Sequence, residues 1–281
     1  MARKKNLASY IDHTLLKPDA TQTDIDRLCD EAAAFNFAAV CIPPSYVSHA
    51  AERLKGKKVA IATVVGFPLG YSTTNSKLVE TKKACKDGAT EIDMVINLTW
   101  VRNQEWNKIG KEIKKIAKYT HSRKALLKVI IETALLTEDD IIKLCDICAN
   151  AKADYVKTST GFNGSGATVE IVTLMRKILP LNVKIKASGG IRSYETARDL
   201  VNAGADRLGS SSSADLMAAK IVEAATSSKS TKKKTSRQTK NTTKNTPAKN
   251  NSEPQAPKTR RRTKKTTETN NSTTNNESKE V

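Results

Sequence analysis

The strongest constraint on the fold is an alternation of strand-like and helix-like segments along the first three quarters of this 281-residue chain. Helical segments show apolar residues at helical spacing, as in Ile141, Leu144, Cys145 and Cys148 behind a capping-box pattern at Thr137–Asp140. Eight strands alternating with helices over roughly 225 residues are typical of a (β/α)₈ barrel. We therefore predict an α/β fold, a single TIM barrel over residues 1–225, with these strands: Tyr10–Leu15, Phe37–Ile42, Val59–Val65, Glu91–Ile96, Leu126–Glu132, Asp154–Thr158, Val183–Ala187 and Asp206–Gly209.

A doubly wound open sheet is the competing architecture, because it also alternates strands and helices. The only glycine-rich loop, Gly161 to Gly166, lacks the G-x-G-x-x-G order of a dinucleotide-binding fold. The barrel therefore ranks first.

Ionisable side chains share one face in four successive predicted strands. Side chains of a strand alternate between its two faces, and the charged set is always opposite Val, Ile, Leu or Met. In a barrel the apolar sets would pack on the outer helices, so the charged sets would lie inside and form a charged chamber. These inward residues are Glu91, Asp93, Lys128, Glu132, Lys157, Lys184 and Lys186.

Lys157 and Lys186 lie near the carboxyl ends of the sixth and seventh predicted strands. Burial and a second nearby cation both lower the pKa of a lysine, and a neutral amine forms imines with carbonyl substrates. Asp93 is the best-placed carboxylate for moving protons. The alternative is a structural ion network, in which the lysines of the chamber pair with its carboxylates without any chemistry.

The ends of the last two predicted strands carry residues that suit an anion. Gly189 and Gly190 follow the seventh strand, and Gly209 with Ser210–Ser213 follows the eighth. Backbone N–H groups freed by glycine, hydroxyl groups and a helix N-terminus bind phosphate, and barrels often bind it after strands seven and eight. Arg192 adds positive charge. This pattern predicts a phosphate site.

Cysteine and histidine give no metal-binding pattern. The five cysteines are too few for a disulfide scaffold, and Cys145 and Cys148 fall on an apolar helical stripe, which favours a packed core over a redox or zinc site. Cys41 ends the second predicted strand and is also expected to be packed.

Neither a signal segment nor a membrane-spanning stretch is evident, so we expect a cytoplasmic protein without membrane contact.

Composition changes sharply at Thr226. Residues 226–281 contain none of Ile, Leu, Phe, Trp, Tyr, Met or Cys, and they hold fifteen Lys/Arg against four Asp/Glu, a net of +11 out of +19 for the chain. Such a segment cannot offset its ordering entropy by apolar burial. We predict a disordered basic tail, with weak nonspecific nucleic-acid contact as its only indicated interaction.

Eight ordered motifs give the chain a specific family resemblance over about Leu7 to Ala224. The chain resembles deoxyribose-phosphate aldolases. The matching segments are Tyr10–Leu16, Val40–Pro44, Ala62–Gly70, Glu91–Asn97, Leu127–Thr133, Val156–Phe162, Lys186–Arg192 and Arg207–Ser212.

The resemblance implies a TIM barrel that reversibly cleaves 2-deoxy-D-ribose 5-phosphate into D-glyceraldehyde 3-phosphate and acetaldehyde. It implies that Lys157 forms the Schiff base, Lys186 tunes it, Asp93 relays protons and Asp12 lies near the substrate hydroxyls. It also implies that no metal or organic cofactor is needed and that the chain forms a homodimer. The residues expected around the phosphate are Gly161, Gly189, Gly190, Gly209, Ser210 and Ser211.

The sequence departs from the family pattern at its end. Members often finish with a tyrosine that assists proton transfer at the enamine carbon, whereas the last tyrosine here is Tyr194. Two other interpretations stay open. One is a related lysine-dependent aldolase for another phosphorylated sugar, and the other is a nucleic-acid-associated protein that binds through its tail.

Overall fold

The computed structural model of the chain describes residues 6–220. The predicted disordered tail, and the nucleic-acid contact expected of it, lie outside the described residues. Within them, no helix combines the length and the apolar character that crossing a bilayer requires.

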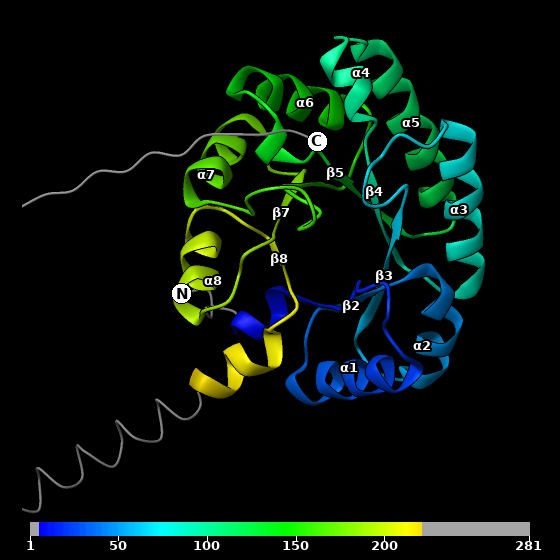
Figure 1. Cartoon of the computed structure of the whole chain (residues 1–281), viewed down its shortest axis with the longest axis vertical. Coiled ribbons are helices and arrows are strands. Elements are labelled where there is room, and N and C mark those ends of the chain that lie inside the picture. Colours follow the sequence, from blue (N-terminus) through cyan, green and yellow to red (C-terminus); the bar gives the residue numbers. More distant parts are fainter. Residues whose placement is uncertain (1–5, 221–281) are drawn as a thin grey trace, which may run out of the picture. The chain divides into compact units, whose positions relative to one another are not determined.

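Eight parallel strands pair in sequence order and close into a barrel, with β1 hydrogen-bonded to β8 (Figure 1). The predicted TIM barrel is therefore confirmed, and each predicted strand overlaps an observed one. The strands are β1 Ile11–Thr14, β2 Ala39–Ile42, β3 Ala60–Val65, β4 Glu91–Val95, β5 Leu126–Ile130, β6 Tyr155–Lys157, β7 Lys184–Ser188 and β8 Arg207–Ser210.

Helices surround the strands in the view of Figure 1. Thr137 caps α6 in a capping box with Asp140, as the sequence indicated, and Thr168 caps α7. Residues 213–220 are helical as well. The helices are α1 Gln22–Phe35, α2 Val47–Arg53, α3 Thr74–Asp87, α4 Leu98–Arg102, α5 Trp106–Ser122, α6 Glu138–Asn150, α7 Val169–Ile178 and α8 Tyr194–Asn202, with 3₁₀ turns η1 Leu7–Tyr10, η2 Pro44–Tyr46 and η3 Thr133–Leu135.

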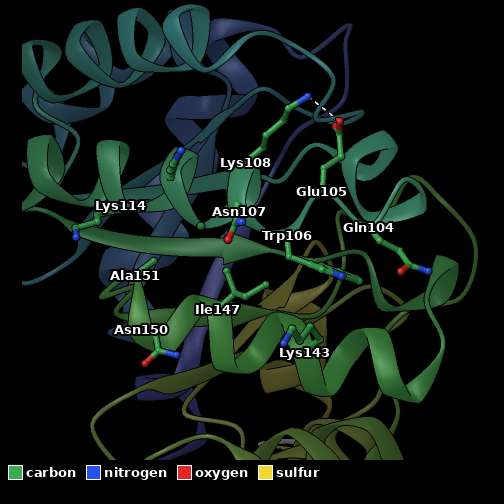
Figure 2. A pocket seen from close by; sticks show the side chains of 12 residues that line it. Gln104, Glu105, Trp106, Asn107, Lys108, Lys114, Lys143, Ile147, Asn150 and Ala151 are labelled. Atoms are coloured by element: carbon green, nitrogen blue, oxygen red, sulfur yellow. Dashed lines mark hydrogen bonds and ion pairs between the residues drawn. The ribbon is translucent and has the colours of Figure 1, made fainter.

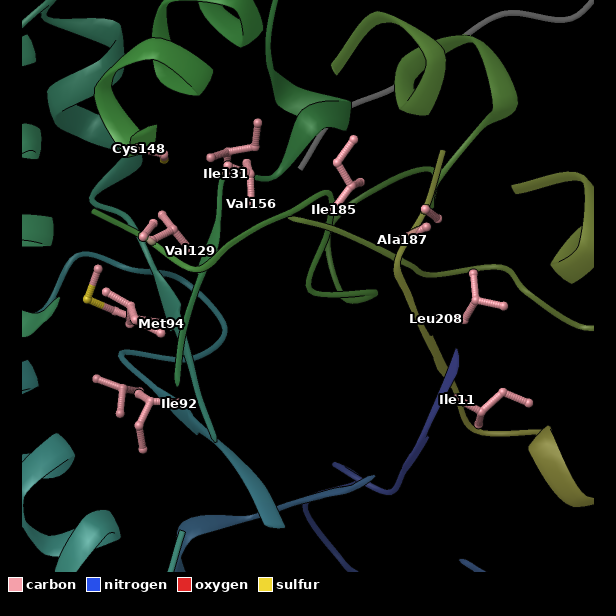
Figure 3. Close-up of a cluster of buried hydrophobic side chains, with 14 of the residues drawn as sticks. Ile11, Ile92, Met94, Val129, Ile131, Cys148, Val156, Ile185, Ala187 and Leu208 are labelled. Carbon is pink, nitrogen blue, oxygen red and sulfur yellow. The ribbon is translucent and has the colours of Figure 1, made fainter. Parts of the chain in front are cut away.

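The main hydrophobic core lies between the strands and the helices. Outward-facing residues of successive strands, such as Met94, Val129 and Val156, are fully buried there (Figure 3). Cys145 and Cys148 of α6 belong to this core, and burial raises the pKa of the Cys145 thiol to about 12. The prediction that these two thiols are packed in the core is confirmed, since both are buried and free.

The inside of the barrel has two different walls. The inward residues of β2 and β3 are small or apolar, with Ala39, Cys41, Ala62 and Val64 forming a separate buried cluster. The remaining strands direct charged residues inward, and the long side chains of Lys128 and Lys186 are completely buried. Small residues on one wall thus leave room for long charged side chains from the other.

Two members of the predicted charged chamber lie elsewhere. Lys184 is exposed at the start of β7, with its ammonium 5.4 Å from the ring centre of Tyr155. Glu132 is buried but follows the end of β5, where it contacts the loop after β6. Alternation along a strand gives the face of a residue correctly, but not its depth along the barrel axis.

A buried ion pair ties α3 and α5 to the end of β4. Lys77 and Glu112 are both fully buried, and the Lys77 ammonium lies 2.9 Å from the Glu112 carboxylate. The same ammonium donates a 2.8 Å hydrogen bond to the backbone carbonyl of Val95. Because Val95 is two residues from Asp93, this pair holds the strand that carries the central carboxylate of the chamber.

Replacing Lys77 by Met should lower the free energy of unfolding by about 3–5 kcal/mol, because Glu112 is left as an unpaired buried charge. Chemical denaturation measures the change. The double variant Lys77→Met/Glu112→Leu should recover most of the loss. Lys83→Met, which breaks the exposed pair with Asp87, should cost less than about 1 kcal/mol. Equal losses for the two single variants would contradict this account.

Candidate active site

The barrel register makes Lys157 and Lys186 direct neighbours. These two residues are paired across β6 and β7, and Asp93 is paired with Lys128 across β4 and β5. Hydrogen bonds to Asp93 from Lys128, Lys157 and Lys186 show that inward-facing side chains from β4 to β7 converge inside the barrel. The sequence placed the two lysines on adjacent strands, and the structure brings them together.

Asp93 is the centre of the chamber. Its Oδ2 atom accepts hydrogen bonds from the Nζ atoms of both Lys157 (2.9 Å) and Lys186 (2.8 Å). Its Oδ1 atom accepts a 2.7 Å hydrogen bond from Lys128. One carboxylate oxygen thus links the two lysines, while the third lysine fixes the orientation of the carboxylate.

Asp12 lies on the far side of Lys186. Its Oδ2 atom accepts a 2.5 Å hydrogen bond from Lys186, and its Oδ1 atom accepts one of 2.6 Å from Arg207. Arg207 also contacts Glu91, which forms a 2.6 Å ion pair with Lys128. These contacts make one continuous buried network. It contains the lysine–carboxylate pairs that the alternative ion-network interpretation expected for Lys128, Lys157 and Lys186, but Lys184 and Glu132 are not part of it.

The charges of this network balance only if Lys157 is neutral. Its carboxylates are Asp12, Glu91 and Asp93, and its cations other than Lys157 are Lys128, Lys186 and Arg207. A fourth buried cation would be uncompensated, which is costly in a low-dielectric interior. The network therefore leaves Lys157 as the group that loses its charge most easily.

The pKa directions follow from this arrangement. Burial lowers the pKa of Lys157 below that of an ordinary lysine; Asp93 opposes the shift and the Lys186 ammonium adds to it. Burial also acts to lower the pKa of Lys186, but Asp12 and Asp93 together raise it above the ordinary value. Although burial acts to raise it, the three lysines hold the pKa of Asp93 well below its usual range. The site thus contains one lysine that loses its proton more easily than usual beside another that holds its proton more firmly.

A cavity of about 250 Å³ opens above Lys157 at the carboxyl ends of the strands. Of the buried charged network, only Lys157 reaches its lining, which also includes every residue that the sequence assigned to phosphate: Gly161, Gly189, Gly190, Gly209, Ser210 and Ser211. Lys186, Asp93 and Asp12 lie below the lining. The expected contact of Asp12 with substrate hydroxyls stays a prediction, since both its oxygens are bonded to cations.

The lining offers hydrogen-bond donors that the protein does not use. Within residues 6–220, the backbone N–H groups of Gly161, Gly189, Gly190 and Ser211 donate to no protein acceptor. Lys17 and Arg192 also line the cavity, and neither has an ion-pair partner in that range. Free N–H groups with two cations favour an anionic ligand.

Sequence reasoning missed several lining residues. Thr14, Lys17, Thr160 and Phe162 all border the cavity. Thr14, Thr160 and Phe162 belong to the motifs around Asp12 and Lys157, so position within these motifs was the available signal. Lys17 lies on a loop outside these motifs, and no local pattern indicated the direction of its side chain.

A larger hollow of about 730 Å³ lies outside the barrel, between α5 and α6 (Figure 2). It is lined by lysines, amide side chains and Trp106, and the one carboxylate there, Glu105, is paired with Lys108. It contains none of the groups of the buried network. Size alone therefore does not locate the chemistry in this fold.

Comparisons with known proteins agree with the geometry. Residues 7–212 match the family model described as DeoC/LacD family aldolase. A deoxyribose-phosphate aldolase of Caldanaerobacter subterraneus is 51% identical over 73% of this chain and 90% of its own length. The chain belongs to the deoxyribose-phosphate aldolase family. It is thus an aldolase, an enzyme of the aldehyde-lyase class.

Two further relatives support this assignment. A deoxyribose-phosphate aldolase of Clostridioides difficile is 50% identical over 74% of this chain and 94% of its own length. The crystal structure of a putative deoxyribose-phosphate aldolase from Coccidioides immitis superposes with a TM-score of 0.74 at 43% identity, over 76% of this chain and 85% of that one. The similarity spans the whole barrel and its site.

The neutral amine of Lys157 should depend on Lys186. We expect imine trapping at Lys157 with a simple aldehyde and borohydride to rise with pH around a midpoint below the ordinary lysine pKa of about 10.4. In Lys186→Met the midpoint should move upward, because Asp93 then acts on Lys157 without the opposing ammonium. Mass spectrometry of the Lys157 peptide measures the profile. Lys184→Met, on the same strand but exposed, should leave it unchanged, and an unshifted midpoint in Lys186→Met would refute the coupling.

Proposed function

We propose that this aldolase cleaves 2-deoxy-D-ribose 5-phosphate reversibly into D-glyceraldehyde 3-phosphate and acetaldehyde, with Lys157 as the Schiff-base nucleophile. The observation that carries the proposal is the position of Lys157. It is the only member of a buried, charge-balanced network that reaches the cavity, and its pKa is lowered there. An amine of this kind is the reagent for imine formation.

The first step is attack of the Lys157 amine on the C1 aldehyde carbon of the open-chain sugar. The carbinolamine then loses its hydroxyl group as water when a proton is supplied, and an imine remains. Asp93 and Lys186 are the proposed proton carriers, because the Asp93 Oδ2 atom accepts hydrogen bonds from both Lys157 and Lys186. A proton leaving one nitrogen therefore has a short path to the other.

The protonated imine then draws electrons from the C2–C3 bond. As this bond breaks, the C3 hydroxyl loses its proton and becomes the aldehyde of glyceraldehyde 3-phosphate, while C1 and C2 remain on Lys157 as an enamine. Protonation of C2 and addition of water release acetaldehyde and the free amine. Every step uses side chains of this chain and water, and water in the cavity is the proposed proton source at C2.

The phosphate is proposed to bind at the rim between β6 and β8. Gly161, Gly189, Gly190 and Ser211 present free backbone N–H groups there, with Arg192 and Lys17 nearby. This end of the cavity suits a dianion through hydrogen bonds and charge. The roles of Gly209 and Ser210, which also line it, are proposed on the same ground.

Incubation with acetaldehyde followed by borohydride should leave one ethyl group on Lys157, located by peptide mapping. Lys157→Ala should lose the adduct and reduce kcat on the order of 10³-fold or more. The other amine that lines the cavity within residues 6–220 is Lys17, which lies on the loop after β1 and has no part in the buried network. Glyceraldehyde 3-phosphate should be preferred over other phosphorylated aldehydes as acceptor in the reverse direction. Labelling elsewhere with Lys157 untouched would overturn the assignment, and another preferred acceptor would favour a different sugar phosphate.

A further inference from the structure

Glu132 is a buried carboxylate that the catalytic steps do not use. It follows β5, its side chain is fully buried, and its backbone is left-handed with φ of +58°. Within residues 6–220 it forms no ion pair, although other buried carboxylates such as Asp12, Asp93 and Glu112 all do. A buried unpaired carboxylate and a left-handed non-glycine residue are both unfavourable, and such features concentrate at functional sites.

In the described part of the chain, all side-chain hydrogen bonds of Glu132 go to one loop, the segment between β6 and α7. Its Oε1 atom accepts a 3.0 Å hydrogen bond from the backbone N–H of Thr160. Its Oε2 atom accepts bonds from the Thr160 hydroxyl (2.5 Å) and the Asn163 amide (3.1 Å). Hydrogen bonds to an ionised acceptor are the stronger kind, so Glu132 fixes both ends of the segment 160–163.

This segment forms part of the cavity wall. Thr160, Gly161 and Phe162 all line the cavity, and the Phe162 N–H donates to the Thr160 hydroxyl oxygen that Glu132 also holds. With the Thr160 and Phe162 N–H groups engaged, the N–H of Gly161 between them has no acceptor in the described part of the chain. The contacts of Glu132 with Thr160 therefore leave the backbone N–H of Gly161 as the donor of this segment that a ligand can use.

The opposite side of the loop is fixed by close backbone packing. A Cβ atom at Gly166 would lie 2.0 Å from the Gly189 carbonyl oxygen, so only glycine fits there. The Ala167 N–H donates to the carbonyl of Ser188 at 3.0 Å. The loop is therefore held between Glu132 on one side and the Gly189–Gly190 turn on the other, which brings its free N–H beside those of that turn.

We infer that Glu132 is a positioning residue for the substrate phosphate. It does not touch the phosphate itself but holds the loop that presents the backbone N–H of Gly161 to it. This inference rests on the proposed function, since it assumes that the phosphate occupies this rim. The phosphate should lose affinity when the anchor is weakened, whereas the chemistry at Lys157 should not.

The test compares a phosphorylated with an unphosphorylated substrate. In Glu132→Gln an NH₂ group replaces one of the two oxygens that accept hydrogen bonds from the loop. The NH₂ group cannot accept these bonds, so the loop is held less firmly. We expect the KM for 2-deoxyribose 5-phosphate to rise about tenfold with kcat nearly unchanged. The kcat/KM for 2-deoxyribose should stay within about twofold of the wild type, because that substrate does not use the rim. Asn163→Ala, which removes one of the three bonds, should show a smaller shift of the same kind.

Glu112→Gln is the matched control, because Glu112 is also a buried carboxylate but is paired with Lys77 away from the cavity. It should lower the melting temperature without changing the ratio of the two kcat/KM values. Equal losses on both substrates in Glu132→Gln, or no loss on either, would overturn the inference and leave Glu132 a merely structural residue.

Direct binding of inorganic phosphate separates this inference from the proposed function. Titration calorimetry on the intact chain should show weaker phosphate binding in Glu132→Gln than in Glu112→Gln, and equal binding would count against the inference. The acetaldehyde adduct on Lys157 should form in both variants. If the wild-type protein formed no such adduct on Lys157, the Schiff-base assignment would be refuted, whatever the phosphate titration shows.

Discussion

The site depends on one shared oxygen atom, Oδ2 of Asp93, which accepts hydrogen bonds from Lys157 and Lys186. A single carboxylate cannot fully compensate two buried ammonium groups, so one of them must give up its proton more readily. The asymmetry comes from the second carboxylate, Asp12, which contacts Lys186 but not Lys157. Lys186 is thereby held as the cation, and Lys157 is left as the amine.

The rest of the fold maintains this arrangement. Lys128 fixes the other oxygen of Asp93, and the Lys77–Glu112 pair holds the end of β4 from outside the barrel. The small residues of β2 and β3 leave space for the long lysine side chains. Above these side chains, the loops after β6, β7 and β8 present backbone N–H groups that have no acceptor within residues 6–220, and they line the same cavity as Lys157.

The sequence predicted the barrel, and the inward direction of Lys157 and Lys186 on neighbouring strands, for a physical reason. Alternation along a strand shows which side chains face inward, and strand order in a closed parallel barrel makes β6 and β7 neighbours. The partners across the barrel were not predictable in this way. That Asp12 holds Lys186, or that Glu132 holds Thr160, depends on the depth of each residue and on loop conformation, and Lys184 was wrongly expected inside for the same reason.

The central claim is that two neighbouring buried lysines differ in protonation. Titration of the intact protein labelled at the lysine side chains, followed by NMR with Lys157 and Lys186 assigned through single substitutions, measures this directly. The account predicts that Lys157 loses its proton below the ordinary lysine range while Lys186 keeps its own well above that point. Coincident titration of the two groups, or deprotonation of Lys186 first, would contradict it.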